Sequence, residues 1–157
     1  MDTKFIVDNN VGKLAKWLRM LGYDALFFDN IDDGRLVKIA LKQGRVLLTR
    51  DTQIMRRRVV TNGQAKVIFI EDDDPKKQLR QVVKTLNLDC HLGQFTRCME
   101  CNHRLVSKTK EEVKDLVPPF VFQTQTQYMQ CPNCNRIYWR GTHWQRMKTG
   151  ITKLDEE

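Results

Sequence analysis

Short apolar runs alternate with helical patterns over the first 88 residues. Phe5–Val7 is an apolar run that predicts a strand, and from Val11 the apolar positions change to the spacing of a helix that ends at Gly22. The same order recurs three more times. The further predicted strands are residues 25–28, 45–49 and 66–70, and the further predicted helices run over residues 35–43, begin after Asp51 and open at Asp74-Pro75.

Strands that alternate with helices indicate a parallel sheet with helices on both faces, because a right-handed crossover between parallel strands needs the helix. Four strand–helix units fit in residues 4–88, and the alternation is lost after Leu88. Gly93–Thr96 has the composition of a linker. We therefore predict an α/β domain over residues 1–92 and a smaller module over residues 93–157.

Acidic residues follow each of the four predicted strands. Because the carboxyl ends of parallel strands meet at one edge of a sheet, we expect these side chains to gather there. Each aspartate also has a structural explanation, since Asp is a favoured N-cap and is stabilised by a helix N-terminus. That explanation accounts poorly for several carboxylates converging in a basic protein. The acids are Asp8 after the first strand, Asp29, Asp32 and Asp33 after the second, Asp51 after the third, and Glu71 with Asp72, Asp73 and Asp74 after the fourth.

A cluster of carboxylates suits Mg²⁺ or Mn²⁺, which prefer hard oxygen ligands and also bind phosphate oxygens. A divalent cation would offset the repulsion among the like charges. It would also activate water and stabilise the charge that develops on a phosphodiester during hydrolysis. The acidic edge therefore favours metal-dependent cleavage of phosphodiester bonds.

The overall charge points in the same direction. The chain has 27 Lys and Arg against 19 Asp and Glu, a formal net charge of +8. A basic balance favours a polyanionic partner such as nucleic acid, although many basic proteins bind none. Basic residues that flank the acids in sequence are candidates for holding the polyanion, and their alternative explanation is that they form solvated helix faces. These candidates are Lys13, Lys16, Arg50, Arg56, Arg57 and Arg58.

Four of the five cysteines form two Cys-x-x-Cys pairs, Cys98 with Cys101 and Cys131 with Cys134. Each pair can form a tight knuckle that places two thiolates about 2.3 Å from one tetrahedral zinc ion. Four thiolates leave no open position, so we predict a structural zinc site and not a catalytic one. The competing explanation is a redox-active pair. Cys90 is left over, and we interpret it as an inert buried thiol.

Aromatic and basic residues are interleaved after the second cysteine pair. Trp139, Arg140 and Trp144 have the residue types of surfaces on which single-stranded bases stack. The alternative is that at least one tryptophan packs the cysteine module against the first domain.

The start of the chain lacks the signature of a signal peptide, and no apolar stretch approaches the ~20 residues that cross a bilayer. We therefore expect an intracellular, cytoplasmic protein with no membrane partner. Paired cysteines in such a setting favour metal binding over disulfides.

Several segments together resemble the Mut-seven C-terminal ribonuclease family, a branch of the PIN-like nucleases with an attached zinc ribbon. The match covers nearly the whole chain, and the combination of segments is specific although no single one is. The segments are residues 5–24 and 45–51, then Cys98–Asn102, Val117–Pro119, Cys131–Cys134 and Tyr138–Trp144.

The resemblance implies a PIN-like three-layer α/β/α domain that acts as a Mg²⁺- or Mn²⁺-dependent ribonuclease, followed by a zinc ribbon. Asp8 matches the acid after the first strand, Asp33 or its neighbour Asp32 matches the acid that opens the second helix, and Asp51 matches the acid after the third strand. Asp29 is a further candidate. Many PIN nucleases also use a Glu from a mid-domain helix, for which this sequence has no clear counterpart.

Three functions follow from these patterns. The first is a ribonuclease whose zinc ribbon helps to hold RNA, with single-stranded RNA the favoured partner and DNA an open alternative. The second is a non-catalytic RNA-binding or assembly module that retains a vestigial nuclease site. The third is a redox or zinc-regulated switch, which would require Cys90 or one cysteine pair to react readily while zinc is bound.

Overall fold

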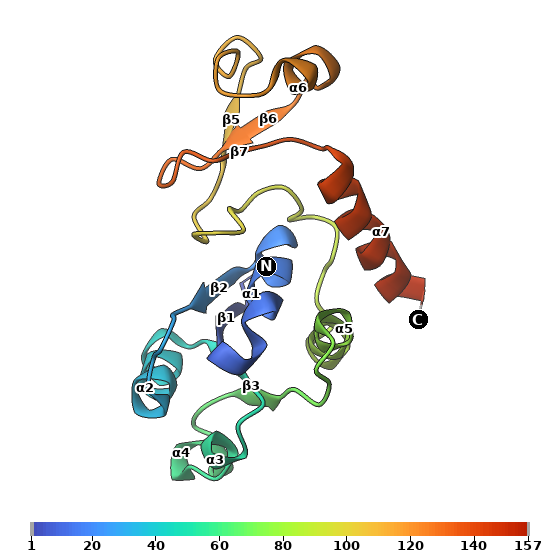
Figure 1. Ribbon diagram of the computed structural model, residues 1–157. Helices are drawn as coiled ribbons and strands as arrows, with labels where there is room; N and C mark the ends of the chain where they lie inside the picture. The colour runs from blue at the N-terminus through green and yellow to red at the C-terminus, as the bar shows by residue number, and fades with distance from the viewer. Residues whose placement is uncertain (1, 157) are drawn as a thin grey trace.

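A four-stranded parallel sheet forms the centre of the first domain. The computed structural model describes residues 2–156, except for the side chains of residues 143, 152 and 154–156. The strands lie in the order β2-β1-β3-β4, and each neighbouring pair is parallel. Their bounds are β1 Lys4–Val7, β2 Asp24–Phe27, β3 Val46–Thr49 and β4 Val67–Phe69, each within two residues of its predicted position (Figure 1).

Helices cover both faces of this sheet. Phe5 and Val7 of β1 face one core, which they share with α1 (Gly12–Met20) and α5 (Pro75–Leu86). Ile6 faces the opposite core, which it shares with α2 (Asp33–Gln43) and α3 (Thr52–Met55). This alternation is what a strand buried on both faces requires, because successive side chains point to opposite sides. The predicted α/β fold with helices on both faces is confirmed.

Aspartate side chains cap the first turns of α2 and α3. Asp32 Oδ1 accepts a hydrogen bond from Arg35 N at 2.8 Å, so α2 begins two residues earlier than predicted. The single helix predicted after Asp51 is two short ones, α3 and α4 (Arg58–Thr61), with Arg56 and Arg57 in the turn between them.

The second module contains a small antiparallel sheet of three strands, β5 (Val106–Lys108), β6 (Tyr128–Gln130) and β7 (Ile137–Tyr138). A short helix, α6 (Pro119–Thr124), lies beside it. The buried side chains of this module are few, so little apolar area stabilises it. Its own core consists of Val113, Val117 and Tyr128.

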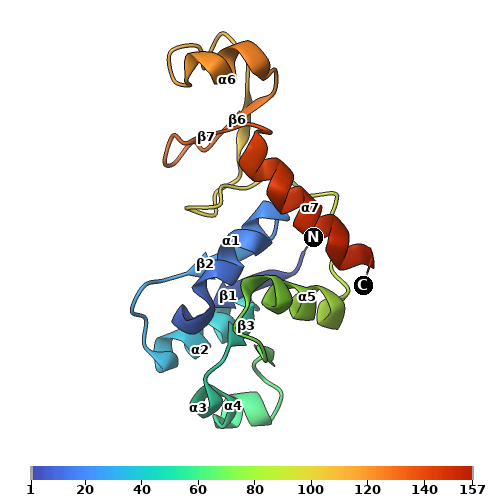
Figure 2. The same cartoon turned by 45° about the vertical axis from the view of Figure 1, so that its right-hand side comes forward.

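The chain then returns to the first domain through α7 (Thr142–Glu156). Trp144, Met147 and Ile151 are buried in the same core as α1 and α5. Figures 1 and 2 show α7 descending from the small sheet to this side of the molecule. Residues on both sides of position 92 therefore share one core, and the boundary near residue 92 stays a prediction.

The linker packs closely on the end of α1. Gly22 has a φ of 97°, and a Cβ at this position would overlap the backbone carbonyl of Gly93. Only glycine combines this backbone conformation with such a close approach. Of the helices described, none is both long and apolar enough to cross a membrane.

Candidate active site and zinc site

Three aspartates meet at the carboxyl end of the sheet. Asp8 follows β1, Asp51 follows β3, and Asp33 is the first residue of α2. One carboxylate oxygen from each lies within 4.8 Å of one from each of the other two. The convergence predicted from the strand order is therefore present, and it selects Asp33 where the sequence left Asp32 as an alternative.

A buried threonine holds two of these acids in place. The hydroxyl of Thr49, which is fully buried, donates to Asp8 Oδ2 at 2.7 Å and accepts from Asp51 N at 3.0 Å. The other oxygen of Asp8 accepts from Asn9 N at 2.8 Å. These bonds fix the position of a carboxylate that is itself buried. Thr49 was not among the predicted site residues, although its hydroxyl, two residues before Asp51 at the end of an apolar strand, was a signal in the sequence.

The two asparagines after Asp8 connect the neighbouring loops. The Asn9 amide, oriented so that both of its ends are satisfied, donates to Phe28 O and accepts from Asn30 N. Asn10 Oδ1 accepts from Arg50 N at 3.3 Å. The segment after β1 is therefore bonded to the loops that follow β2 and β3, and Asp8 is the N-cap of a short 3₁₀ helix, Asn9–Val11, that precedes α1.

The three carboxylates repel one another. The pKa of Asp33 is raised, first by burial and then by the charges of Asp51 and Asp8, while the nearby Arg57 guanidinium lowers it in part. A divalent cation would relieve this repulsion, and hard oxygen donors are the ligands that Mg²⁺ and Mn²⁺ prefer. The donor set therefore fits such an ion.

The remaining predicted acids lie outside the cluster. Asp32 caps α2 and is exposed, and Asp29 is exposed in the turn between β2 and α2. After β4, Asp72 accepts from Asp74 N at 2.8 Å and lies 4.0 Å from the Lys77 ammonium. The expectation that acids from all four strands would converge was wrong for the fourth strand. The acids after β4 lie outside the cluster, and Asp72 forms its contacts within the turn before α5 and with Lys77 of that helix.

The predicted RNA-binding cations lie in different surroundings. Arg56, Arg57 and Arg58 are exposed, and the charge of Arg57 acts on Asp33 of the acidic cluster. Arg50 is half-buried, and its Nη1 has no hydrogen-bond partner among the described residues. Two others lie on α1: Lys13 is exposed, and Lys16 forms an ion pair with Glu100 at 3.1 Å.

The four cysteines of the two pairs gather at one point. Their sulfur atoms lie within 4.8 Å of one another, with Cys101 and Cys131 at 3.1 Å and Cys98 and Cys134 at 3.7 Å. Thiolates at about 2.3 Å from a tetrahedral zinc ion would be about 3.8 Å apart. Burial and the neighbouring thiols raise the pKa of Cys134 to about 12, so a cation is needed to keep this thiol ionised.

The two knuckles have the same backbone construction. Cys98 N donates to His103 O and Asn102 N to Cys98 O, and Cys131 N donates to Arg136 O and Asn135 N to Cys131 O. Asn102 and Asn135 both have positive φ, at 71° and 64°. Two matching turns, each presenting two thiols to a shared point, fit one zinc ion with no open position.

The first knuckle is bonded to the edge strand β2. Asn102 Oδ1 accepts from Ala25 N at 3.0 Å, and its Nδ2 donates to Asp24 Oδ1 at 2.7 Å. The buried Arg19 donates to Ala25 O and to Met99 O, each at 2.9 Å. These contacts are at the start of β2, so the cysteine module lies at the amino end of the sheet, opposite the acidic cluster (Figure 1).

The aromatic residues of the second module have unequal roles. Trp144 is buried, packs edge-on against Phe95 at 6.1 Å between ring centroids, and lies beneath the Arg140 guanidinium at 5.0 Å. Trp144 therefore packs the cysteine module against the first domain, as the alternative interpretation expected, and is not a free stacking surface. Trp139 is half-buried and Arg140 is exposed.

Comparison with known proteins identifies the family of the chain. The model of the Mut7-C RNAse domain family matches residues 3–151. The chain belongs to this family. Among curated proteins it is similar to the human protein described as exonuclease mut-7 homolog, with 29% identity over 102 residues. That match covers 63% of the chain and only 12% of the human protein. No solved structure matches the chain.

Proposed function

We propose that the protein is a ribonuclease of PIN-like type, in which Asp8, Asp33 and Asp51 bind Mg²⁺ or Mn²⁺ and hydrolyse a phosphodiester bond of RNA. The observation that carries this proposal is the meeting of three carboxylates from three separate segments, at the edge of the sheet where α/β proteins place their sites. Membership of a family described as a ribonuclease domain supports it.

The chain's own groups have distinct tasks in this reaction. The Thr49 hydroxyl holds the Asp8 carboxylate and the Asp51 backbone, and Gln53 N donates to the Asp51 carboxylate, so these oxygens are in position before substrate arrives. Asp33, whose pKa is raised by burial and then by the charges of its neighbours, completes the ligand set. When bound, the cation supplies an acidified water and neutralises charge on the phosphate. The exposed Arg57 is placed to interact with the phosphate backbone.

We also propose that Cys98, Cys101, Cys131 and Cys134 bind one structural zinc ion. Zinc would supply the folding energy that the small core of this module lacks. Through Asn102 and Arg19 it would also hold the module against the first domain.

The test is cleavage of a labelled single-stranded RNA by the zinc-loaded protein, with Mn²⁺, with Mg²⁺ and with no added divalent cation. Asp8→Asn and Asp51→Asn are expected to abolish cleavage. Asp29→Asn is the matched control, because it removes an aspartate near the site that lies outside the cluster, and it is expected to cleave as the wild type does.

The outcomes separate the possible functions. Cleavage that needs added metal and is lost only in the cluster variants supports the ribonuclease. RNA binding without product under every condition would refute it in favour of a non-catalytic RNA-binding module. A labelled DNA of the same sequence determines whether the enzyme requires a 2′-hydroxyl.

A further inference from the structure

A groove runs between α1 and the cysteine module. Its volume is ≈ 460 Å³, and it is lined by side chains from both halves of the chain. One wall comes from α1, and the other comes from the two knuckles and β7. The residues that matter to its chemistry are Lys13, Lys16 and Trp17 on the first wall, and Glu100, Arg136 and Tyr138 on the second.

One wall of the groove, α1, begins close to the acidic cluster in the chain. Lys13 is the second residue of α1 and is separated from Asp8 by only the 3₁₀ turn Asn9–Val11 and one glycine. Lys16 and Trp17 lie three and four residues further on, so all three share one helix face. Arg136 lies on the cysteine module, which contacts the amino end of the sheet. A polymer in this groove would therefore extend from the acidic cluster toward the cysteines.

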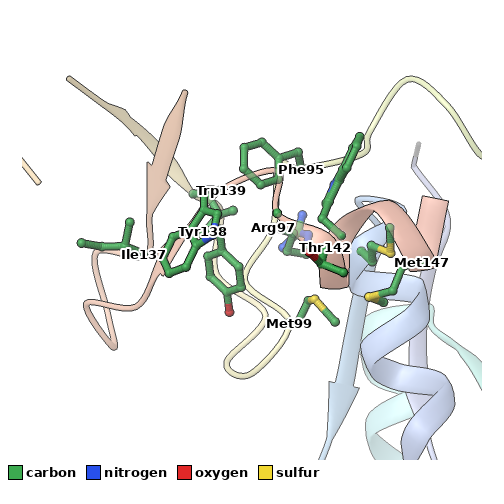
Figure 3. Close-up of a pocket in the computed structure, with 12 residues that line it drawn as sticks. Phe95, Arg97, Met99, Ile137, Tyr138, Trp139, Thr142 and Met147 are labelled. Carbon is green, nitrogen blue, oxygen red and sulfur yellow. The ribbon is translucent and has the colours of Figure 1, made fainter. Parts of the chain in front are cut away.

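The lining combines cations with aromatic rings. Lys13 and Arg136 are exposed, and Trp17 and Tyr138 are half-buried beside them. Positive grooves with aromatic side chains are typical of single-strand binding, because phosphates contact the cations and unstacked bases contact the rings. An apolar cavity of ≈ 220 Å³ adjoins the groove and shares Met99, Tyr138 and Met147 with it (Figure 3).

One acid lies in the groove. Glu100 pairs with Lys16 at 3.1 Å, and the two side chains are about half exposed, at 42% and 52%. Exposed pairs of this kind are weak. A phosphate group could therefore replace Glu100 as the partner of Lys16. Until Glu100 is displaced in this way, its negative charge opposes the binding of a polyanion.

We infer that this groove holds the single-stranded part of the RNA substrate that extends beyond the cleaved bond, with Lys13, Lys16 and Arg136 contacting phosphates. This inference rests on the proposed ribonuclease function for the identity of its occupant. The net charge of +8 favours a polyanion over a protein segment.

The test measures binding and not cleavage. The zinc-loaded full chain is titrated with a fluorescent single-stranded RNA at several salt concentrations, with no added Mg²⁺ or Mn²⁺. The groove variant replaces all three cations by alanine. A control variant with the same net charge replaces three exposed lysines away from the groove: Lys38→Ala, Lys66→Ala and Lys114→Ala.

The groove variant is expected to reduce the slope of log affinity against log salt by about 2, since each single-strand phosphate contact contributes about 0.7. The control is expected to keep the wild-type slope. Glu100→Gln removes the opposing charge and is expected to raise affinity about two- to fivefold at low salt. A duplex of the same sequence should bind more weakly than the single strand, because its bases cannot reach the rings.

Equal slopes for the groove and control variants, or unchanged affinity in Glu100→Gln, would overturn the inference. Because Glu100→Gln is a gain in binding, a folding defect cannot imitate it. If these binding results hold but the wild type never cleaves RNA with Mn²⁺, the groove stands and the ribonuclease fails. If the wild type cleaves but the groove variant binds as the control does, the ribonuclease stands and the groove fails.

Discussion

Replacing Asp33 by asparagine should stabilise the protein and inactivate it at the same time. The substitution removes one of three like charges whose oxygens lie within 4.8 Å of one another. Two unit charges at that distance interact by about 3.5 kcal/mol at an effective dielectric constant of 20 and about 0.9 kcal/mol in bulk water. Asp33 is only partly buried, so solvent screening favours the lower figure, about 1 kcal/mol for each neighbour.

Without added Mg²⁺ or Mn²⁺, Asp33→Asn is therefore expected to raise the free energy of unfolding at pH 7 by about 1–2 kcal/mol, less the lost attraction of Arg57. The pKa of Asp33 is raised in the folded state, so the native protein binds this proton more tightly than the unfolded chain. Its contribution to stability is present below the unfolded pKa of about 3.9 and is lost as the pH rises through the higher folded pKa. The Asp33→Asn variant should not show this loss of stability with rising pH.

The assay is urea unfolding of zinc-loaded wild type and variant, repeated with increasing MnCl₂. A ligand at 100 times its dissociation constant stabilises the native state by about 2.7 kcal/mol, so the wild type should gain stability with Mn²⁺. The variant should gain far less, and the order of stability should reverse. Asp29→Asn should have the same unfolding free energy as the wild type at every MnCl₂ concentration. A variant that is no more stable than wild type without added metal, or that gains as much from Mn²⁺, would refute the clustering of charge at Asp33.

Three further changes test the fold around the two sites. Thr49→Val should cost about 2–4 kcal/mol in unfolding free energy and most of the cleavage activity, because a buried hydroxyl that holds two acids is lost, whereas Thr49→Ser should retain activity. Gly22→Ala should cost at least about 2 kcal/mol in thermal unfolding, because its φ is positive and the new Cβ would overlap Gly93. Asn102→Ala should destabilise the protein by about 2–4 kcal/mol in urea, and Asn135→Ala by only about 1 kcal/mol, because both lose a left-handed asparagine but only Asn102 bonds to β2. Equal losses for the two asparagines would contradict the role given to that contact.

The first domain was predictable because its signals are local. Each strand is a short apolar run, the central strands β1 and β3 are buried on both faces, and the long helices have an apolar stripe, so the order of these elements implies a parallel sheet. The shared edge of that sheet then places Asp8, Asp33 and Asp51 together without any knowledge of distances. The choice between Asp32 and Asp33 was not predictable, because it depends on which of them begins the helix and which caps it.

The second module was less predictable because its contacts are distant in sequence. Arg19 bonds to Met99 O across 80 residues, and no local pattern marks either partner. The return of α7 had a signal that was overlooked, since Trp144, Met147 and Ile151 have the i, i+3, i+7 spacing of one helix face. The equivalent positions of Asn102 and Asn135 also marked the two knuckles as copies of one turn.

The structure separates the tasks of the two proposed metal sites. The acidic cluster is held by Thr49 and by the asparagines after β1, all within the first domain, so it does not depend on contacts with the cysteine module. The groove does depend on the cysteine module, because that module forms one of its walls. Helix α1 links the two: it begins just after Asp8, and its last turn holds the module through Arg19. Removing zinc should therefore weaken RNA binding before it disturbs the position of the aspartates, and the loss of activity should be largest in KM.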